Sequence, residues 1–454
     1  MESWLDLLSA RVEALRRTPR ADRVLFLLDA DGVLLDPRPA VLDRLHDADR
    51  RAGREDFADL RAADFEGQPV QSALAARLGG ERLERAQRVL GPLLEPELGA
   101  GARAALLDLL RWLQLHPGSF VALRSARDEA RAAATLAEVR RNTQGMGLRF
   151  SEDLLLLGPA DGQREAGLAG LLERGFALAA TLDAHLAQPG DAQRDGAPLA
   201  FDRQRLLELP TAGRFGAGLS GAVRPPVPLN ARGLCSRDSL ATLLGSSASG
   251  VEVEIGSDPR GELFLRGAPA GEAPIAFEEL LGMLAQGEKS LVLDLGSCDT
   301  LMPRALLALT RSGFRADRVA ICAPAARWRD SAFRGRVGDG FAAAVLRASV
   351  RAADGRDEGA DSGLGTQLDQ LASLGIGRIG VEWDDPRRDE VLAIAAGRGL
   401  DADLACPRSL PALLSALAQR PAAVTCELPQ GRAPDRLEQP AAPFAVRSRS
   451  AMRA

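Results

Sequence analysis

Two hydrophobic patterns divide the chain into candidate strands and candidate helices. Short continuous apolar runs bounded by turn residues are typical of buried strands in a parallel sheet, whereas apolar residues three and four positions apart are typical of amphipathic helices. Both patterns alternate through the first 187 residues, and a helix is predicted over 3–17. The candidate strands there are Val24–Leu28, Ser119–Leu123, Leu154–Leu157 and Phe176–Leu182. This alternation predicts an α/β domain over 1–187 with a doubly wound, Rossmann-like sheet.

Between the first two candidate strands, residues 38–98 have only helical spacing, with breaks at Gly79-Gly80 and Pro92. We therefore expect a small helical cap at about 38–98. Further helices are predicted over 103–115 and 126–141.

A change in composition separates this half from the next. Residues 188–228 are rich in Gly, Pro and Ala, which predicts a linker. Strand and helix patterns then alternate again over 229–429. The candidate strands are Leu229–Arg232, Val251–Ile255, Leu291–Leu295, Val319–Cys322, Ala343–Val350, Arg378–Trp383, Asp403–Cys406 and Ala423–Cys426. Eight such units predict a small (β/α)8 TIM-type barrel. The Pro-, Arg- and Ser-rich tail at 430–454 is predicted to be disordered.

Composition narrows the class of protein. The chain has 454 residues, 46% of them apolar, and a net charge of −5, which argues against a nucleic-acid partner. No apolar run reaches the roughly 18 residues that a membrane span requires, and residues 1–17 are amphipathic, unlike a cleavable signal. Five cysteines without a Cys-x-x-Cys spacing indicate buried thiols in a reducing compartment. We therefore expect a cytoplasmic protein.

Scarce residue types exclude several chemistries. Lys289 is the single lysine, tyrosine is absent, and the three histidines all lie within the first 185 residues. Lys289 stands in Gly-Glu-Lys-Ser, which is not the Gly-Lys-Ser/Thr end of a P-loop. The His-Glu-x-x-His pattern of a zinc protease is also missing.

The first candidate site is Asp29-Ala-Asp31-Gly32, which follows the first predicted strand. Two carboxylates at a strand end can point into one cavity, where one attacks a phosphoryl group and the other transfers a proton. An anionic nucleophile needs a nearby cation, because one uncompensated charge pair at about 4 Å costs about 4 kcal/mol at an effective dielectric near 20.

This segment resembles the first motif of the haloacid dehalogenase-like hydrolase superfamily, Asp-x-Asp-Gly after a hydrophobic strand. The resemblance spans about residues 22–187. It implies a Mg²⁺-dependent phosphohydrolase with an aspartyl-phosphate intermediate, in which Asp29 is the nucleophile and Asp31 the acid and base.

The further motifs of that superfamily match in part. Ser125 stands where the family has the Ser or Thr that binds phosphate. Asp183 resembles the carboxylate of the fourth motif, which with Asp29 and Asp31 would hold Mg²⁺. The lysine of the third motif is missing, and Arg164 is the candidate to replace it. A guanidinium is wider than an ammonium group and is not a compact point charge.

The second candidate site lies in the predicted barrel. By the period of two, Glu252 and Glu254 share one face of a strand, and Asp294 comes from the next strand. We expect these three carboxylates near the mouth of the barrel, where they repel one another unless a cation lies among them. Arg232, at the end of the first barrel strand, or a divalent metal such as Mg²⁺ or Ca²⁺ would supply it. The other interpretation is an internal Arg–Glu network that supports the fold.

This half resembles the glycerophosphodiester phosphodiesterases and their menorin-type relatives. Ala231-Arg-Gly233 stands where that family has His-Arg-Gly, and Glu252-x-Glu254 where it has metal ligands. The family histidines act as general acid and base, and here Ala231 and about Arg266 occupy their positions. The resemblance therefore implies a barrel without its acid–base groups, which contribute about 10²–10⁴-fold to rates.

Three hypotheses about function follow. The leading one is a weak or specialised Mg²⁺-dependent phosphohydrolase acting on a small phosphorylated metabolite, joined to a non-catalytic barrel. The first alternative is a non-catalytic ligand-binding or scaffold protein. The second is a metal-dependent phosphodiesterase that uses the barrel carboxylates. The sequence does not indicate an oligomeric state.

Overall fold

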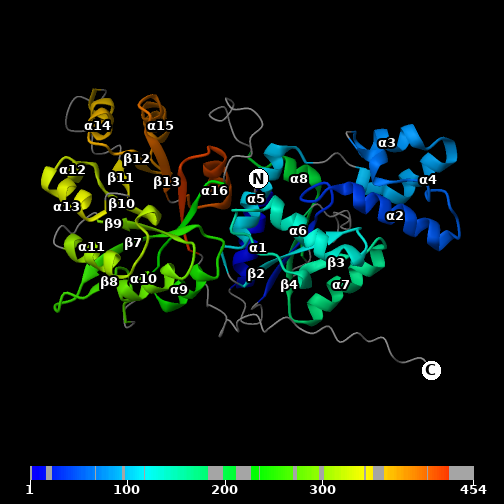
Figure 1. The fold of residues 1–454 in the computed structure, drawn as a ribbon, viewed down its shortest axis with the longest axis horizontal. Coiled ribbons are helices and arrows are strands. Elements are labelled where there is room, and N and C mark those ends of the chain that lie inside the picture. The colour runs from blue at the N-terminus through cyan, green and yellow to red at the C-terminus, as the bar shows by residue number, and fades with distance from the viewer. Residues whose placement is uncertain are drawn as a thin grey trace.

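The computed structural model describes most of the chain as two α/β halves (Figure 1). The described residues are 3–16, 23–66, 68–94, 98–116, 118–182, 198–210, 226–234, 236–268, 273–295, 301–341, 344–350, 362–405 and 407–428. Asp183 and the tail at 430–454 lie outside the described residues.

The first half is built on a five-stranded parallel sheet of strand order β3-β2-β1-β4-β5. The strands are β1 (Val24–Asp29), β2 (Ser119–Ser125), β3 (Leu155–Leu157), β4 (Ala177–Leu182) and β5 (Leu199–Phe201). The accompanying helices are α1 (Trp4–Arg16), α5 (Ala100–Leu113), α6 (Ala132–Asn142), α7 (Asp161–Glu173) and α8 (Arg203–Leu207). The prediction of a parallel α/β sheet is confirmed, and four of its strands were predicted.

The central strand β1 is apolar at every position before Asp29 because both faces of the sheet are covered. Phe26 and Leu28 pack in the cluster that includes residues of α1 and α5. Leu25 and Leu27 point to the other face, in a cluster with Leu171 of α7. Side chains alternate across a strand, so two covered faces require a continuous apolar run.

A helical insertion with its own apolar core lies between β1 and β2. Its elements are α2 (Pro37–Ala52), η1 (Ala62–Phe65), α3 (Val70–Arg77), α4 (Gly80–Leu90) and η2 (Gly91–Leu94). Asp36 caps the first helix by accepting a hydrogen bond from the Arg38 backbone, and Gly53 ends it in the left-handed conformation at φ 61°. Phe57 and Phe65 are buried in the insertion's core. A helical insertion therefore lies where the sequence predicts the cap.

The predicted linker at 188–228 was wrong for part of its length. Leu199–Phe201 forms β5, which pairs with β4, and Asp202 caps the short helix α8. Leu206 is buried in the core of the first half. The Gly- and Pro-rich composition of the surrounding residues hid a short apolar strand and its cap.

The second half is a closed barrel of eight parallel strands. The order β6-β14-β13-β12-β11-β10-β9-β7 is closed by pairing of β6 with β7. The strands are β6 (Leu229–Arg232), β7 (Gly250–Ser257), β9 (Ser290–Asp294), β10 (Val319–Pro324), β11 (Val345–Val350), β12 (Arg378–Glu382), β13 (Asp401–Ala405) and β14 (Ala423–Glu427). All eight candidate strands are confirmed, with ends shifted by at most two residues. A further strand, β8 (Leu263–Leu265), pairs antiparallel with β7 outside the barrel.

Helices cover the outside of the barrel. They are α9 (Arg237–Leu244), α10 (Phe277–Ala285), α11 (Met302–Arg311), α12 (Ala325–Trp328), α13 (Ser331–Phe341), α14 (Ser362–Ser373), α15 (Arg388–Gly397) and α16 (Leu410–Ala418). Seven barrel strands are each followed by at least one of them; in the part of the chain that is described, no helix follows β14. The prediction of eight complete strand–helix units is therefore confirmed for seven.

Two findings bear on the predictions from composition. Cys322 and Cys426 are buried thiols that form no disulfide, as predicted; the other cysteines lie outside the described residues. Within the described ranges, no helix has both the length and the apolar character that a membrane crossing requires.

Candidate functional site

Asp29 is paired with an arginine on the neighbouring strand. It is the last residue of β1, and the register of the sheet places Arg124 of β2 beside it. The Nε and Nη2 atoms of Arg124 donate to the two carboxylate oxygens of Asp29. Burial tends to lower the pKa of Arg124, but the hydrogen bonds and charge of Asp29 outweigh it and raise that pKa. Asp29 is thus neutralised from within the sheet, its side chain only 20% exposed.

Asp31 is buried in the turn that follows β1. One of its carboxylate oxygens accepts from Ser125 Oγ and the other from the Ala126 backbone, each at 2.8 Å. Arg127 Nε lies 3.9 Å away. Burial raises the pKa of Asp31 to about 6, against the lowering effect of these hydrogen bonds and of Arg127. Ser125, which the resemblance assigns to phosphate, is committed to Asp31 in this arrangement.

Arg164 lies near Asp29 but is directed to other partners. It donates to the Gly158 carbonyl and to Asp161 at the start of α7. Burial lowers the pKa of Arg164, and the neighbouring charges of Arg44 and Arg124 act in the same direction. Three guanidinium groups therefore lie close together at this edge of the sheet. Sequence reasoning predicted one of them and missed the other two.

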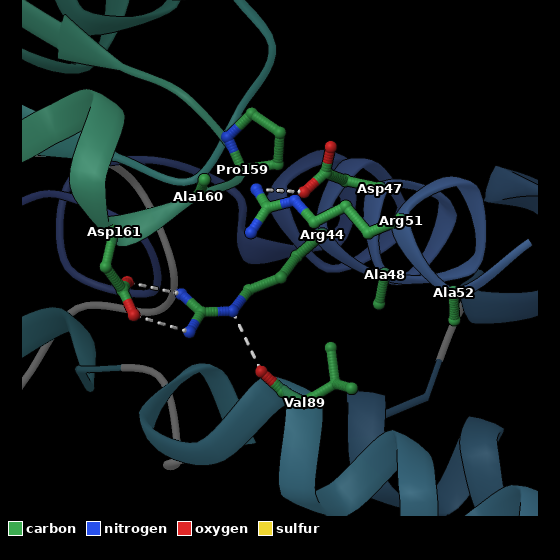
Figure 2. A pocket seen from close by; sticks show the side chains of 9 residues that line it. All are labelled: Arg44, Asp47, Ala48, Arg51, Ala52, Val89, Pro159, Ala160 and Asp161. Atoms are coloured by element: carbon green, nitrogen blue, oxygen red, sulfur yellow. Dashed lines mark hydrogen bonds and ion pairs between the residues drawn. The ribbon is translucent and has the colours of Figure 1, made fainter.

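A pocket of about 370 Å³ opens beside this cluster, between the helical insertion and the loop that leads into α7. Figure 2 shows Arg44 of α2 reaching across it, with its guanidinium between Asp161 and the Val89 carbonyl. Arg51 lines the opposite side and pairs with Asp47. Asp161 therefore joins the pocket to Arg164, because it accepts from both arginines.

The predicted Mg²⁺ site does not fit this arrangement. Both oxygens of Asp29 accept from Arg124, and both oxygens of Asp31 accept from groups of the β2 end. Asp183 lies outside the described residues. Among those that are described, no group of three or more His, Cys, Asp or Glu side chains could hold a metal ion.

Glu252 is not at the barrel mouth, which corrects the prediction that placed it there. It lies inside the barrel, where Arg347 Nη1 donates to it at 2.8 Å and Thr425 Oγ1 at 3.1 Å. Asp403 lies 3.6 Å from the same arginine. All four of these side chains are buried. Glu252 therefore takes part in an internal Arg–Glu contact, as the alternative interpretation expects.

The other predicted barrel residues do lie at the carboxyl ends of the strands. Glu254 and Asp294 are neighbours in register on β7 and β9. Arg232 lies 3.7 Å from Glu254 and 4.0 Å from Glu382, which ends β12. Sequence reasoning missed Glu382 and Glu427, which end β12 and β14; each lies within one residue of the end of a predicted strand, a position that could have identified it.

The charged groups of the barrel form two layers. Glu252, Arg347 and Asp403 form a buried inner layer, and the groups at the carboxyl ends of the strands form a more exposed outer layer. The inner layer raises the pKa of Asp403 to about 6 and that of Cys322 to about 12, in both cases chiefly through burial. Arg347 lies between them and has its pKa raised by the surrounding acidic groups, although burial alone would lower it. Cys322 therefore remains a thiol at neutral pH and is a poor nucleophile.

Comparison with solved structures concerns the barrel half. It is similar to a proposed glycerophosphoryl diester phosphodiesterase from Agrobacterium tumefaciens, at 12% identity over 44% of this chain and 93% of that chain, with a TM-score of 0.38. A glycerophosphodiester phosphodiesterase from Parabacteroides distasonis is 13% identical over 44% and 93%, with a TM-score of 0.34. An Oleispira antarctica phosphodiesterase bound to sn-glycerol-3-phosphate is 11% identical over 44% and 92%, with a TM-score of 0.33.

These likenesses concern the fold alone. No protein-family model and no curated protein matches this sequence.

Proposed function

We propose that the first half of the protein binds a small phosphorylated molecule at the arginine cluster beside Asp29 without turning it over efficiently. The barrel is proposed to be non-catalytic. The observation that carries this proposal is the two-pronged ion pair between Arg124 and Asp29, which occupies the carboxylate that would have to attack phosphorus.

Charge at the cluster favours an anion. Arg124 and Arg164 are both buried, and Asp29, the partner of Arg124, is 20% exposed. Asp161 is 58% exposed, so solvent screens much of its charge. A phosphoryl group offers three oxygens to guanidinium donors, and such charge-assisted hydrogen bonds are stronger than neutral ones. The adjacent pocket supplies space for the rest of the ligand.

Binding can be tested with inorganic phosphate and a simple phosphomonoester by titration calorimetry. Arg164→Met should weaken binding about ten-fold or more, because a hydrogen bond to a charged group is worth about 1.5–3 kcal/mol. Arg205→Met is the matched control, since Arg205 forms an exposed pair with Glu208 on α8. Equal affinity of wild type, Arg164→Met and Arg205→Met would overturn the proposal.

Turnover separates this proposal from the hydrolase hypothesis. One observation favours the hydrolase: Asp31 has a pKa near 6, which suits a general acid, and it stands two positions after Asp29. Phosphomonoester hydrolysis with Mg²⁺ present should be the same for wild type and Asp29→Asn if the site only binds. A rate that depends on Asp29 would restore the hydrolase hypothesis.

The barrel proposal has a separate test. The chain has no histidine beyond residue 185, and Arg347 already neutralises Glu252, one of the expected metal ligands. Cleavage of a phosphodiester should therefore be undetectable. Diester cleavage that survives Asp29→Asn and disappears in Glu254→Gln would establish the carboxylate-based phosphodiesterase instead.

A further inference from the structure

Among the described residues no helix follows β14, so the barrel wall at β14 and β6 lacks the helix that would come after the last strand; α16, which precedes β14, contacts that strand. Each earlier barrel strand leads into a helix that packs on the outside, whereas the described chain ends at Leu428, one residue after β14. Leu229 and Ala231 of β6 and Val424 and Cys426 of β14 are nevertheless buried. Some other part of the chain must cover them.

Besides α16, the carboxyl-terminal end of α5, from the first half of the chain, packs on this side of the barrel. Leu115, just after α5, is buried in the same apolar cluster as Leu229 and Val424 of the barrel. Trp112 of α5 packs against both this cluster and the core of the first half. In Figure 1, α5 and α1 lie beside α16 of the barrel, and these helices are in contact.

Apolar residues of the barrel are in turn buried in the core of the first half. Leu410 and Leu414 belong to α16, a barrel helix, but they are buried in the core of the first half. The two halves therefore share side chains across their junction, in the manner of neighbouring layers of one core.

Polar groups of the barrel also donate hydrogen bonds to carbonyls at the carboxyl-terminal end of α5. The last carbonyls of a helix have no partner within it. Ser247, in the loop between α9 and β7, donates from Oγ to the Arg111 carbonyl at 2.6 Å and from its backbone nitrogen to the Gln114 carbonyl at 3.1 Å. Gly147 permits this loop to come close, because a Cβ there would lie 2.8 Å from the Ser247 carbonyl oxygen.

Arg111 adds a buried charged group to the otherwise apolar junction. It is only 1% exposed and pairs with Asp108, one turn earlier on α5, at 3.2 Å. Its Nη2 also reaches Ser249 Oγ of the barrel at 3.4 Å. Burial lowers the pKa of Arg111, and the charge of Asp108 opposes that shift. A buried guanidinium tolerates few arrangements of its surroundings, because losing its partners is costly.

We infer that α5 serves as the helix that closes the barrel wall at β14 and β6, so that the two halves fold and unfold as one cooperative unit. The first half is then an obligate internal partner of the barrel, whatever either half binds. The inference is independent of the proposed phosphate site, because the two lie at opposite edges of the first sheet. The phosphate site is at the carboxyl ends of its strands, whereas the junction involves the carboxyl-terminal end of α5 and the start of β2.

Hydrogen exchange of the full-length protein tests this inference. Leu115→Ala should raise amide exchange in β6 and β14 by about ten-fold or more, because it removes apolar cover from strands distant in sequence. Leu45→Ala is the matched control: it removes the same side chain from the buried core of the helical insertion and should leave both strands unchanged. Faster exchange confined to α5 and its neighbours in the first half would overturn the inference.

Two further variants keep the test decisive if Leu115→Ala does not fold. Ser247→Ala removes only the hydroxyl that donates to the Arg111 carbonyl. Leu414→Ala instead truncates a barrel side chain that is buried in the core of the first half. The first should raise exchange at the end of α5, and the second should do so in α1 and α5. Calorimetry of the wild type should show a single unfolding transition, and two well-separated transitions would contradict the inference.

Discussion

Asp29 and Asp31 are two positions apart in the chain but have different electrostatic surroundings. Asp29 meets the guanidinium of Arg124, whereas Asp31 is buried among weaker donors and its pKa rises to about 6. The difference arises because a neighbouring charge stabilises an ionised carboxylate and burial destabilises it. At the residue scale, one carboxylate of the site is therefore paired with a guanidinium, and the other is buried with a raised pKa.

The coupling between Arg124 and Asp29 predicts a double-mutant result. Each single variant, Arg124→Met or Asp29→Asn, should lower the free energy of unfolding by about 1–3 kcal/mol, because each leaves a largely buried polar partner behind. The double variant should lose less than the sum of the two. Urea unfolding curves of the four proteins measure this coupling, and strict additivity would show that the pair is not coupled.

The raised pKa of Asp403 predicts how the free energy of unfolding depends on pH. Its pKa is near 6 in the folded protein and near 3.8 when unfolded, so the folded state holds a proton that the unfolded state has released between these values. Its contribution to stability therefore falls as pH rises from about 4 to 6, by about 3 kcal/mol at most. Asp403→Asn should remove this slope, and the exposed Asp401→Asn should not. Unfolding by urea at pH 4.5 and pH 7 provides the measurement.

At the scale of elements, the strands of the barrel are joined by a charged inner layer as well as by backbone pairing. Glu252 of β7 and Arg347 of β11 meet inside the barrel although they are 95 positions apart in the chain. Trp328 Nε1 donates to the Arg347 carbonyl at 2.9 Å, so the outer helices and this inner layer meet at one residue of β11.

Arg347→Met should lower the free energy of unfolding by about 3–5 kcal/mol, because it leaves Glu252 buried without its cation and Asp403 with Arg378 alone, at 3.7 Å. Adding Glu252→Gln should restore part of the loss. Tryptophan fluorescence can follow unfolding because Trp328 contacts this residue. An effect of Arg347→Met below about 1 kcal/mol, the range of an exposed pair, would show that the network is solvated.

At the scale of the whole molecule, the two halves have one junction and two outward-facing sites. The candidate phosphate site uses the carboxyl ends of β1 and β2, and the barrel mouth uses the carboxyl ends of its own strands. The junction uses the opposite end of the first sheet, next to the start of β2, and the loop before β7. Neither site is therefore built from residues of both halves.

If phosphate binds as proposed, a single cooperative unit should carry its stabilisation into the barrel. At about 100 times the dissociation constant, phosphate should add about 2.7 kcal/mol to the free energy of unfolding. Variants that retain only Trp4 or only Trp328 report the first half and the barrel separately. Both should show the same rise of the unfolding midpoint, and a rise at Trp4 alone would show that the halves unfold independently.

The sequence by itself determined most of the elements and several faces. Apolar runs identified the eight barrel strands and four strands of the first sheet, and the period of two placed Glu252 and Glu254 on one face. These features depend on residues only a few positions apart, whose pattern is visible in the chain. The short strand β5 escaped because it lies within a Gly-, Pro- and Ala-rich stretch whose composition predicts a linker.

Only the tertiary structure decided which charges meet. The register of β1 and β2 places Arg124 against Asp29, the closure of the barrel places Arg347 against Glu252, and the junction places α5 against the barrel wall. Each of these contacts joins residues far apart in sequence, whose distance depends on strand order, register and packing of all the intervening elements. Local periodicity can assign a carboxylate to a face, but the partner that neutralises it is set by what the fold brings opposite.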